Sequence, residues 1–272
     1  MTSIPYVHGY SARESVRLGD QALTLSELLH HDERYPAGAR VLEAGCGTGA
    51  QTVLLARNNP SARLVSVDLS SASLELARQA VEQERMTNVR FENADVMNLP
   101  FSNGEFDAVF VCFVLEHLAE PLRALTELKR VLRPGGTITV IEGDHGSAYF
   151  HPDSEFAKRA IQCLVDLQKR DGGDSLIGRR LYPLLDQAGF SEIAVSPRVV
   201  YADSSRPDMV EGFTRNTFTA MVEGVEEKAL QAGMIDPVGW QQGIADLRRT
   251  AGPGGVFNYT FFKARAIKFV FT

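Results

Sequence analysis

A glycine-rich segment, Val41-Leu-Glu-Ala-Gly-Cys-Gly-Thr-Gly-Ala-Gln51, directly follows a short apolar run and leads into a helical pattern. Glycine lets a backbone turn sharply and approach a ligand closely. In an open α/β sheet such a turn lies at the carboxyl edge of the first strand, where ligands bind. The segment therefore predicts a small-molecule site, although a tight turn needed only for packing would contain the same glycines.

Two carboxylates end the next two apolar runs. Asp68 follows Gly49 at the spacing typical of a carboxylate that accepts hydrogen bonds from ribose hydroxyls, and its alternative role is to cap the helix that follows. Asp95 ends the third run, where a carboxylate is able to accept a hydrogen bond from an exocyclic amine such as that of adenine. The two residues together predict a nucleoside at this edge.

The end of the fifth apolar run offers groups for proton transfer. Glu142 and His145 lie within four positions there, and an imidazole with a pKa near 6.5 can take a proton from an acceptor. Hydrogen bonds to the backbone are the alternative role of such residues. Tyr10 precedes the first helical pattern and is expected to close the pocket, unless it lies in a disordered tail. The predicted catalytic residues are His145, Glu142 and Tyr10.

Short β-branched runs alternate with helical patterns from residue 38 onwards, which is typical of a parallel α/β sheet. We expect a seven-stranded, mostly parallel sheet whose last strand is antiparallel. The expected strands are 40–43, 63–68, 89–92, 108–113, 137–142, 192–201 and 259–271, and the expected helices are 11–30, 51–57, 71–85, 121–132, 156–168 and 178–188.

The length of the chain, 272 residues, exceeds what such a sheet requires. We expect a single domain with an N-terminal lid helix (1–37), a core sheet (38–201 and 252–272) and a helical cap insertion (202–251). The cap is expected to determine which acceptor is bound. Its alternative role is an oligomer interface, so a homodimer stays open.

Composition excludes several classes of function. A net charge of −6 without a cluster of lysine and arginine does not favour a nucleic-acid partner. No apolar run reaches the length of a membrane-spanning helix, and the first residues lack the pattern of a secretory signal, so we expect a cytoplasmic protein without membrane partners. The three cysteines are far apart, and Glu142-Gly-Asp-His145 alone is too short a stretch to surround a metal ion, so we expect no metal site.

At this point the chain resembles the class I S-adenosylmethionine-dependent methyltransferases, in the small-molecule branch that includes ubiquinone and menaquinone methyltransferases. The resemblance covers about residues 38–145. The matching segments are Glu43-Ala-Gly-Cys-Gly-Thr-Gly49, Val67-Asp-Leu-Ser70, Asn93-Ala-Asp-Val96, Leu99-Pro-Phe101, Phe106-Asp107, Cys112-Phe-Val-Leu-Glu-His117 and Leu132-Arg-Pro-Gly-Gly136.

The resemblance implies a Rossmann-like methyltransferase fold, S-adenosylmethionine as cofactor with S-adenosylhomocysteine as product, and methylation of a small organic molecule at nitrogen, oxygen or carbon. It also implies that the segment from Glu43 to Gly49 holds the methionine part, Asp68 the ribose, Asp95 with Val96 the adenine, and the backbone of Cys112 and Phe113 the methionine carboxylate and sulfonium. The cofactor-binding residues expected on this basis are Glu43, Gly45, Cys46, Gly47, Gly49, Gln51, Asp68, Leu69, Asp95, Val96, Cys112 and Phe113.

Two alternatives stay open from the sequence. A nicotinamide dehydrogenase also has a glycine-rich first turn, but its fingerprint is G-x-G-x-x-G, and Glu43 would repel a pyrophosphate while attracting the ammonium of methionine. The second alternative is a regulatory protein that binds the cofactor, or one that uses it without methylation, because residues that bind a cofactor do not prove turnover.

Overall fold

The computed structural model of the protein describes residues 12–269, with residues 12–16 described by their backbone alone. Its sheet has seven strands in the order β3-β2-β1-β4-β5-β7-β6, and neighbours among β1 to β5 pair in parallel. The run Val109-Phe-Val111 is wholly buried, as expected of a parallel strand covered on both faces. The strands are β1 (Arg40–Ala44), β2 (Arg63–Asp68), β3 (Val89–Asn93), β4 (Phe106–Cys112), β5 (Leu132–His151), β6 (Ser191–Ala202) and β7 (Val256–Ile267).

The described chain divides into two compact units. Unit 1 contains residues 12–25, 143–176 and 198–261, and unit 2 contains residues 26–142, 177–197 and 262–269. Four of the five boundaries fall within α1 (Ala12–His30) and within the strands β5, β6 and β7, and the fifth lies between Leu176 and Ile177. The predicted single domain with its three parts stays a prediction.

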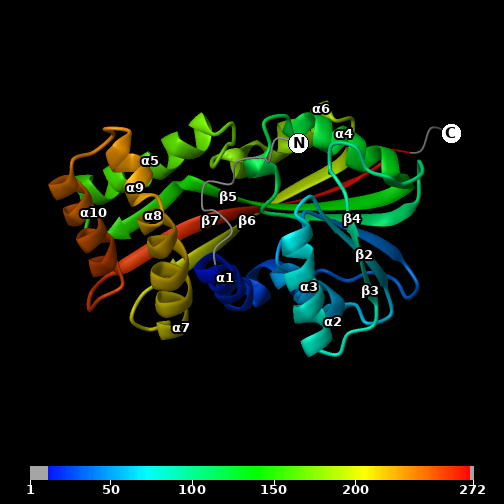
Figure 1. Ribbon diagram of the computed structural model, residues 1–272, viewed down its shortest axis with the longest axis horizontal. Helices are drawn as coiled ribbons and strands as arrows, with labels where there is room; N and C mark the ends of the chain where they lie inside the picture. Colours follow the sequence, from blue (N-terminus) through cyan, green and yellow to red (C-terminus); the bar gives the residue numbers. More distant parts are fainter. Residues whose placement is uncertain (1–11, 270–272) are drawn as a thin grey trace. The chain divides into compact units, whose positions relative to one another are not determined.

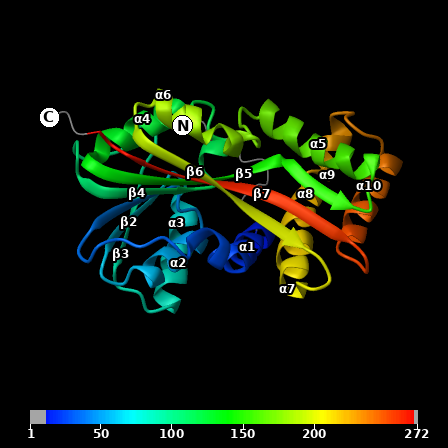
Figure 2. The same cartoon turned by 180° about the vertical axis from the view of Figure 1, so that it is seen from behind.

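Unit 2 contains β1 to β4 and the helices that cover them. Figures 1 and 2 show α2 (Ala50–Asn58) and α3 (Ser71–Gln83) on one face, and α4 (Pro121–Val131) and α6 (Leu181–Gln187) on the other. The helix α3 begins where the Ser70 hydroxyl accepts a hydrogen bond from the Ser73 N–H at 3.2 Å. Proline in the first turn of α4 begins that helix, because no N–H is needed there. Short 3₁₀ turns, η1 (Leu115–His117) and η2 (Ile177–Arg180), precede α4 and α6.

Unit 1 is rich in helices. Phe213 and Phe218, five residues apart in the π-helix η3 (Val210–Thr219), are buried against Tyr259 of β7, with ring centroids 5.5 and 5.4 Å away. Trp240 and Leu247 of α10 are also buried. The expected insertion 202–251 therefore supplies much of the core of this unit. The other helices are α5 (Glu155–Arg170), α7 (Pro207–Met209), α8 (Ala220–Glu223), α9 (Glu226–Gln231) and α10 (Pro237–Thr250).

The predicted seven-stranded, mostly parallel sheet with one antiparallel strand is confirmed. The expected end of the fifth strand at Glu142 is wrong, because β5 continues to His151. The last residue of β5 that pairs with β4 is Ile141, and the continuation is possible because β7 is the other neighbour of β5. The seventh strand was placed too late, since β7 begins at Val256 and ends at Ile267. Within the described residues, no helix is both long and apolar enough to cross a membrane.

Candidate active site

Three glycines form the turn between β1 and α2, and all three have positive φ: +71° at Gly45, +53° at Gly47 and +86° at Gly49. A Cβ on Gly45 would lie 2.6 Å from Cγ2 of Val114, and one on Gly49 would lie 2.8 Å from Cα of Ala77. Nothing lies within 4 Å of the corresponding position on Gly47. The outer two glycines are therefore required by packing, whereas Gly47 faces open space where a ligand can approach.

Asp68 ends β2 beside this turn. One of its carboxylate oxygens accepts the N–H of Gly47 at 2.9 Å, and the other accepts the N–H of Ser70 at 2.8 Å. The side chain that caps α3 belongs to Ser70 rather than to Asp68. The alternative role of Asp68 as the helix cap is therefore not what the structure shows. Asp68 links the glycine turn to the end of β2, and each oxygen retains a further lone pair.

Asn93, at the end of β3, was quoted within a motif but not predicted as a site residue. Its amide donates to the carbonyl oxygens of Asp68 at 2.9 Å and of Leu69 at 2.8 Å. Leu69 presents a 48% exposed apolar side chain directly after Asp68. Asn93 thus fixes the backbone that carries both residues, and its position at the end of the neighbouring strand was the available signal.

Asp95 lies two residues beyond β3, where a carboxylate oxygen accepts the N–H of Met97 at 2.8 Å. This is a short turn of the kind that aspartate commonly forms. The adjacent Val96 is buried, with 8% of its surface exposed. The turn places a carboxylate and an apolar side chain at the same end of the sheet as Asp68, since β2 and β3 are parallel neighbours.

Glu43 lies in β1, two residues before the glycine turn, and is 2% exposed. The Ser66 hydroxyl donates to its carboxylate at 2.6 Å. Burial raises the pKa of Glu43 to about 7, the hydrogen bond from Ser66 lowers it, and the charge of Asp68 raises it. A buried carboxylate without a cation is destabilised, so a positively charged ligand group nearby would restore its ionised form.

The other predicted cofactor residues also lie in unit 2. Cys46 is in the glycine turn and Cys112 ends β4, and burial raises the pKa of both thiols, so that neither is a reactive thiolate. Phe113 follows β4 with a φ of +58°, unusual for a residue other than glycine. Gln51 lies in the first turn of α2 and is half-buried.

The three residues predicted to be catalytic are in different parts of the chain. Glu142 belongs to unit 2, His145 belongs to unit 1, and Tyr10 lies outside the described residues. In unit 1, the Nδ1 atom of His145 lies 2.8 Å from the hydroxyl of Tyr259, and both side chains are buried. Gly143 makes room for that hydroxyl, because a Cβ there would collide with it.

A hollow of about 660 Å³ in unit 2 lies at the opposite edge of the sheet, near the residues that precede β1 and begin β4. Four of the charged groups that line it are already in ion pairs: Arg133 with Asp107 at 2.6 Å, and Arg265 with Glu33 at 2.7 Å. Ligands of open α/β sheets bind outside the carboxyl ends of the strands. The candidate site is therefore the glycine turn and not this hollow.

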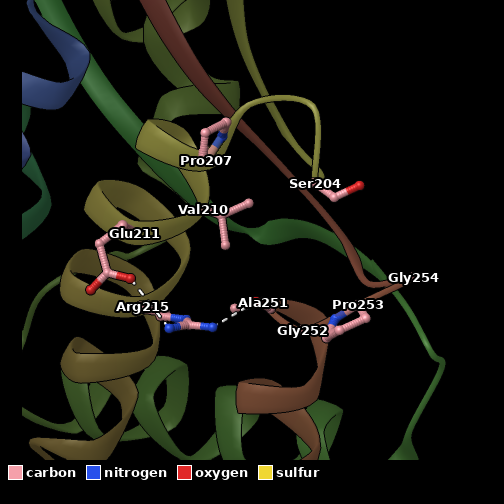
Figure 3. Close-up of a pocket in the computed structure, with 9 residues that line it drawn as sticks. All are labelled: Ser204, Pro207, Val210, Glu211, Arg215, Ala251, Gly252, Pro253 and Gly254. Atoms are coloured by element: carbon pink, nitrogen blue, oxygen red, sulfur yellow. Dashed lines mark hydrogen bonds and ion pairs between the residues drawn. The ribbon is translucent and has the colours of Figure 1, made fainter.

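Unit 1 has its own hollow, of about 430 Å³, between η3 and the turn that follows α10 (Figure 3). Its guanidinium, from Arg215, donates to the carbonyl of Ala251 at 2.9 Å and pairs with Glu211 at 3.3 Å. Arg215 thus satisfies a carbonyl at the carboxyl end of α10.

Among residues 12–269, no group of three or more histidine, cysteine, aspartate or glutamate side chains is placed to hold a metal ion.

Comparisons with known proteins show which proteins this chain resembles. Residues 42–140 match the family described as a methyltransferase domain. An uncharacterized 37.1 kDa protein in transposon TN4556 of Streptomyces fradiae is 34% identical over 219 residues, which are 79% of this chain and 59% of that protein. The demethylmenaquinone methyltransferase of Thermus thermophilus is 41% identical over 106 residues, or 39% of this chain and 48% of that enzyme.

The fold has relatives among solved structures. A phosphoethanolamine N-methyltransferase 2 from Haemonchus contortus, in complex with phosphomonomethylethanolamine and S-adenosylhomocysteine, aligns with a TM-score of 0.57 over 92% of this chain and 53% of that one. At 18% identity this likeness shows the fold alone. The chain spans about half the length of the curated relatives that it matches. Residues 42–140 of this chain therefore match a methyltransferase domain, and the fold is shared with solved methyltransferase structures.

Proposed function

We propose that this protein is an S-adenosylmethionine-dependent methyltransferase that methylates a small organic molecule at nitrogen, oxygen or carbon. The observation that carries the proposal is the glycine turn of unit 2. Gly47 faces open space, its N–H is held by Asp68, and the buried Glu43 precedes the same turn. A carboxyl group at this position is suited to a ligand with a cationic group and unsuited to a pyrophosphate.

The residues present fit S-adenosylmethionine part by part. Glu43 and the glycine turn would hold the methionine end, because the ammonium group supplies the cation that the buried carboxyl lacks. Asp68 would accept hydrogen bonds from the ribose, and Asp95 with Val96 would contact the adenine. When bound, the cofactor supplies a methyl group on a sulfonium, and the chain contributes chiefly by holding the acceptor in line with it.

For an acceptor that must lose a proton, we propose His145 as the group that takes it. Its Nδ1 atom lies 2.8 Å from the Tyr259 hydroxyl. With Nδ1–H donating to that oxygen, Nε2 carries the lone pair that a base requires. The participation of Tyr10 and of Glu142 in proton transfer stays a prediction.

The relatives do not identify the acceptor. Several of them are demethylmenaquinone methyltransferases, but their similarity covers only about two fifths of this chain. The matched domain covers residues 42–140. It therefore includes no residue of unit 1, whose segments are part of α1 and residues 143–176 and 198–261. We therefore propose a small organic acceptor, without extending the quinone specificity of those enzymes to this protein.

We further propose that this protein is cytoplasmic and binds no nucleic acid. For its oligomeric state, we propose a homodimer. The net charge of −6 supports the absence of a nucleic-acid partner. Light scattering of the purified chain measures its assembly, and a gel-shift assay at low salt tests nucleic-acid binding. A strong shift with duplex DNA would contradict the proposal.

Calorimetry with S-adenosylhomocysteine tests the cofactor site. We expect the substitution Asp68→Ala to weaken binding by about 2–3 kcal/mol, because it removes hydrogen bonds to a charged group. Asp68→Asn should weaken binding less, since one oxygen remains to accept the Gly47 N–H. The matched control is Asp186→Ala, which removes an exposed carboxylate from α6. Equal affinities for the wild type and Asp68→Ala would refute the ribose assignment.

Turnover is tested by incubating the protein with methyl-labelled S-adenosylmethionine and a metabolite extract. A methyltransferase transfers label to at least one small molecule in the extract. A protein that binds the cofactor for regulation, or uses it without methylation, labels none. Binding of S-adenosylhomocysteine without any labelled product would therefore favour that alternative.

A further inference from the structure

The turn that follows β4 has a strained backbone. Phe113 adopts a φ of +58°, which lies in the left-handed region that residues other than glycine rarely occupy. Its N–H donates to the carbonyl of Ile141 on the neighbouring strand β5 at 2.9 Å. Such a conformation persists only where the surroundings hold it in place. The segment after Phe113 therefore needs support from other residues of unit 2.

Glu142 provides that support. One oxygen of its carboxyl group, Oε1, accepts the N–H of Val114 at 3.0 Å and the N–H of Leu115 at 2.7 Å. Both N–H groups are at the start of η1, where a helical turn has no backbone acceptors of its own. A single side chain on β5 thus fixes two successive residues of the turn after β4.

The same turn is in contact with the glycine turn. Val114 is packed so closely on Gly45 that a Cβ there would lie 2.6 Å from its Cγ2 atom. Glu142 therefore acts on the glycine turn through one intermediate, because it holds the backbone of Val114 and the side chain of Val114 limits where Gly45 can lie.

We propose that Glu142 is a positioning residue, whose carboxyl group fixes the turn after β4 against the glycine turn and so shapes the site for the methionine end of the cofactor. This inference depends on the proposed function, because it names the ligand that the positioned backbone would hold. It assigns Glu142 a role different from the proton transfer predicted from its sequence position.

The surroundings of Glu142 favour positioning over proton transfer. Its side chain is 0% exposed, so no acceptor reaches it unless other groups move. Its Oε1 atom is occupied by two N–H groups, and its Oε2 atom is buried without a hydrogen-bond partner. Burial, and then the charge of Glu116, raises the pKa of this carboxyl group. An uncharged carboxyl oxygen still accepts hydrogen bonds, so the support does not depend on ionisation.

Substitutions at Glu142 separate the two roles. Glu142→Gln retains an acceptor oxygen of the same shape, so we expect its affinity for S-adenosylhomocysteine to stay within about threefold of the wild type. Glu142→Ala removes the acceptor, and we expect its affinity to fall at least about tenfold, or 1.4 kcal/mol. Faster amide hydrogen exchange at Val114 and Leu115 in the alanine variant, but not in the glutamine variant, is the readout that does not require a ligand.

Two further variants complete the test. The matched control is Glu105→Ala, because Glu105 also accepts a backbone N–H, from Ser102 at 2.8 Å, but in the segment that leads into β4. We expect it to leave cofactor affinity unchanged. If Glu142→Ala does not fold, Val114→Ala tests the next contact, and we expect it too to weaken S-adenosylhomocysteine binding.

The possible results distinguish the proposals from each other. Unchanged affinity and unchanged exchange in a folded Glu142→Ala variant would overturn the positioning role. If Glu142→Ala does not fold, an unchanged affinity of Val114→Ala for S-adenosylhomocysteine would also overturn the positioning role. Loss of labelling in Glu142→Gln, with normal S-adenosylhomocysteine affinity and normal exchange, would assign Glu142 to proton transfer instead. A wild type that fails to bind S-adenosylhomocysteine refutes the proposed cofactor site, and the exchange measurement then still decides whether Glu142 holds the turn.

Discussion

Replacing Glu43 by glutamine should stabilise the fold at alkaline pH while weakening the cofactor site. Burial raises the pKa of Glu43 from 4.5 to about 7, so the folded state holds a proton that the unfolded state releases between these values. The favourable contribution is present below pH 4.5 and is lost as the pH rises through about 7. Glutamine has the same shape, still accepts from Ser66, and never ionises.

The size of the effect follows from the shift. The difference between 4.5 and about 7 corresponds to about 3 kcal/mol, because one pKa unit is about 1.4 kcal/mol. We therefore expect Glu43→Gln to raise the free energy of unfolding by about 3 kcal/mol at pH 8 relative to the wild type, and by less than about 1 kcal/mol at pH 5.

Urea unfolding of both proteins at several pH values measures this difference. His30 is another buried group with a large shift: burial and then the charge of Lys263 lower its pKa to about 4, so it destabilises the fold as the pH falls below 6.5. Comparing the variant with the wild type cancels this contribution, and above pH 6.5 it is constant. An identical dependence on pH in the two proteins would refute the assignment of a raised pKa to Glu43.

The same substitution should act in the opposite direction on binding. In the wild type, an ammonium group beside Glu43 would favour its ionised form, so binding near pH 7 should release part of a proton. Calorimetry of S-adenosylhomocysteine in two buffers of different ionisation enthalpy detects that proton. We expect weaker binding and no such release in Glu43→Gln, and an equal affinity in both proteins would show that Glu43 is not near the bound cation.

The remaining predictions concern single atoms. Gly49→Ala places a Cβ 2.8 Å from Cα of Ala77 at a φ of +86°, so chemical denaturation should show a loss of at least about 2 kcal/mol in stability. Gly47→Ala adds backbone strain at a φ of +53°, but its Cβ meets nothing within 4 Å. Denaturation should therefore show a smaller loss of stability than for Gly49→Ala, and calorimetry should show weaker cofactor binding. Tyr259→Phe removes the hydroxyl beside His145, so nuclear magnetic resonance should show a changed tautomer at His145, with about 1 kcal/mol of stability lost.

The glycine turn and the strands around it could be predicted from sequence because their signals are local. An uninterrupted apolar run such as that of β4, followed by a fixed spacing of glycine and aspartate, needs no distant contact to be recognised. The continuation of β5 could not be predicted in this way. The first residues after Glu142, from Gly143 to Ser147, are polar or glycine and resemble a turn. In unit 1, however, the Ser147 hydroxyl accepts the N–H of Thr260 at 2.9 Å, from a segment more than a hundred residues away. Pairing with β7 thus overrides the local preference.

The role of a titratable residue is harder to predict than its place. Sequence position predicted Glu142 and His145 at the end of the fifth strand, whereas β5 continues past both to His151. It also did not show that Glu142 points into the protein towards two backbone N–H groups. Sequence position placed Asn93 near a strand end but did not show that its amide joins two strand ends, and it gave no signal for Tyr259, which contacts His145 from a strand far away in sequence. Each of these contacts depends on side-chain direction, which the pattern of apolar residues does not encode.

Two of the buried carboxyl groups of unit 2, those of Glu43 and Glu142, have different partners. Glu43 and Glu142 are both almost completely buried, and burial raises the pKa of each. Glu142 accepts two N–H groups of the main chain, so its energy depends on the position of the turn after β4. For Glu43 the short hydrogen bond comes from the Ser66 side chain, and Asp68 adds a negative charge that opposes its ionisation. A ligand cation near Glu43 would therefore lower the free-energy cost of ionising its carboxyl group. Glu142 instead forms its two hydrogen bonds only when the backbone of the turn after β4 is in place, so its role is to position that backbone.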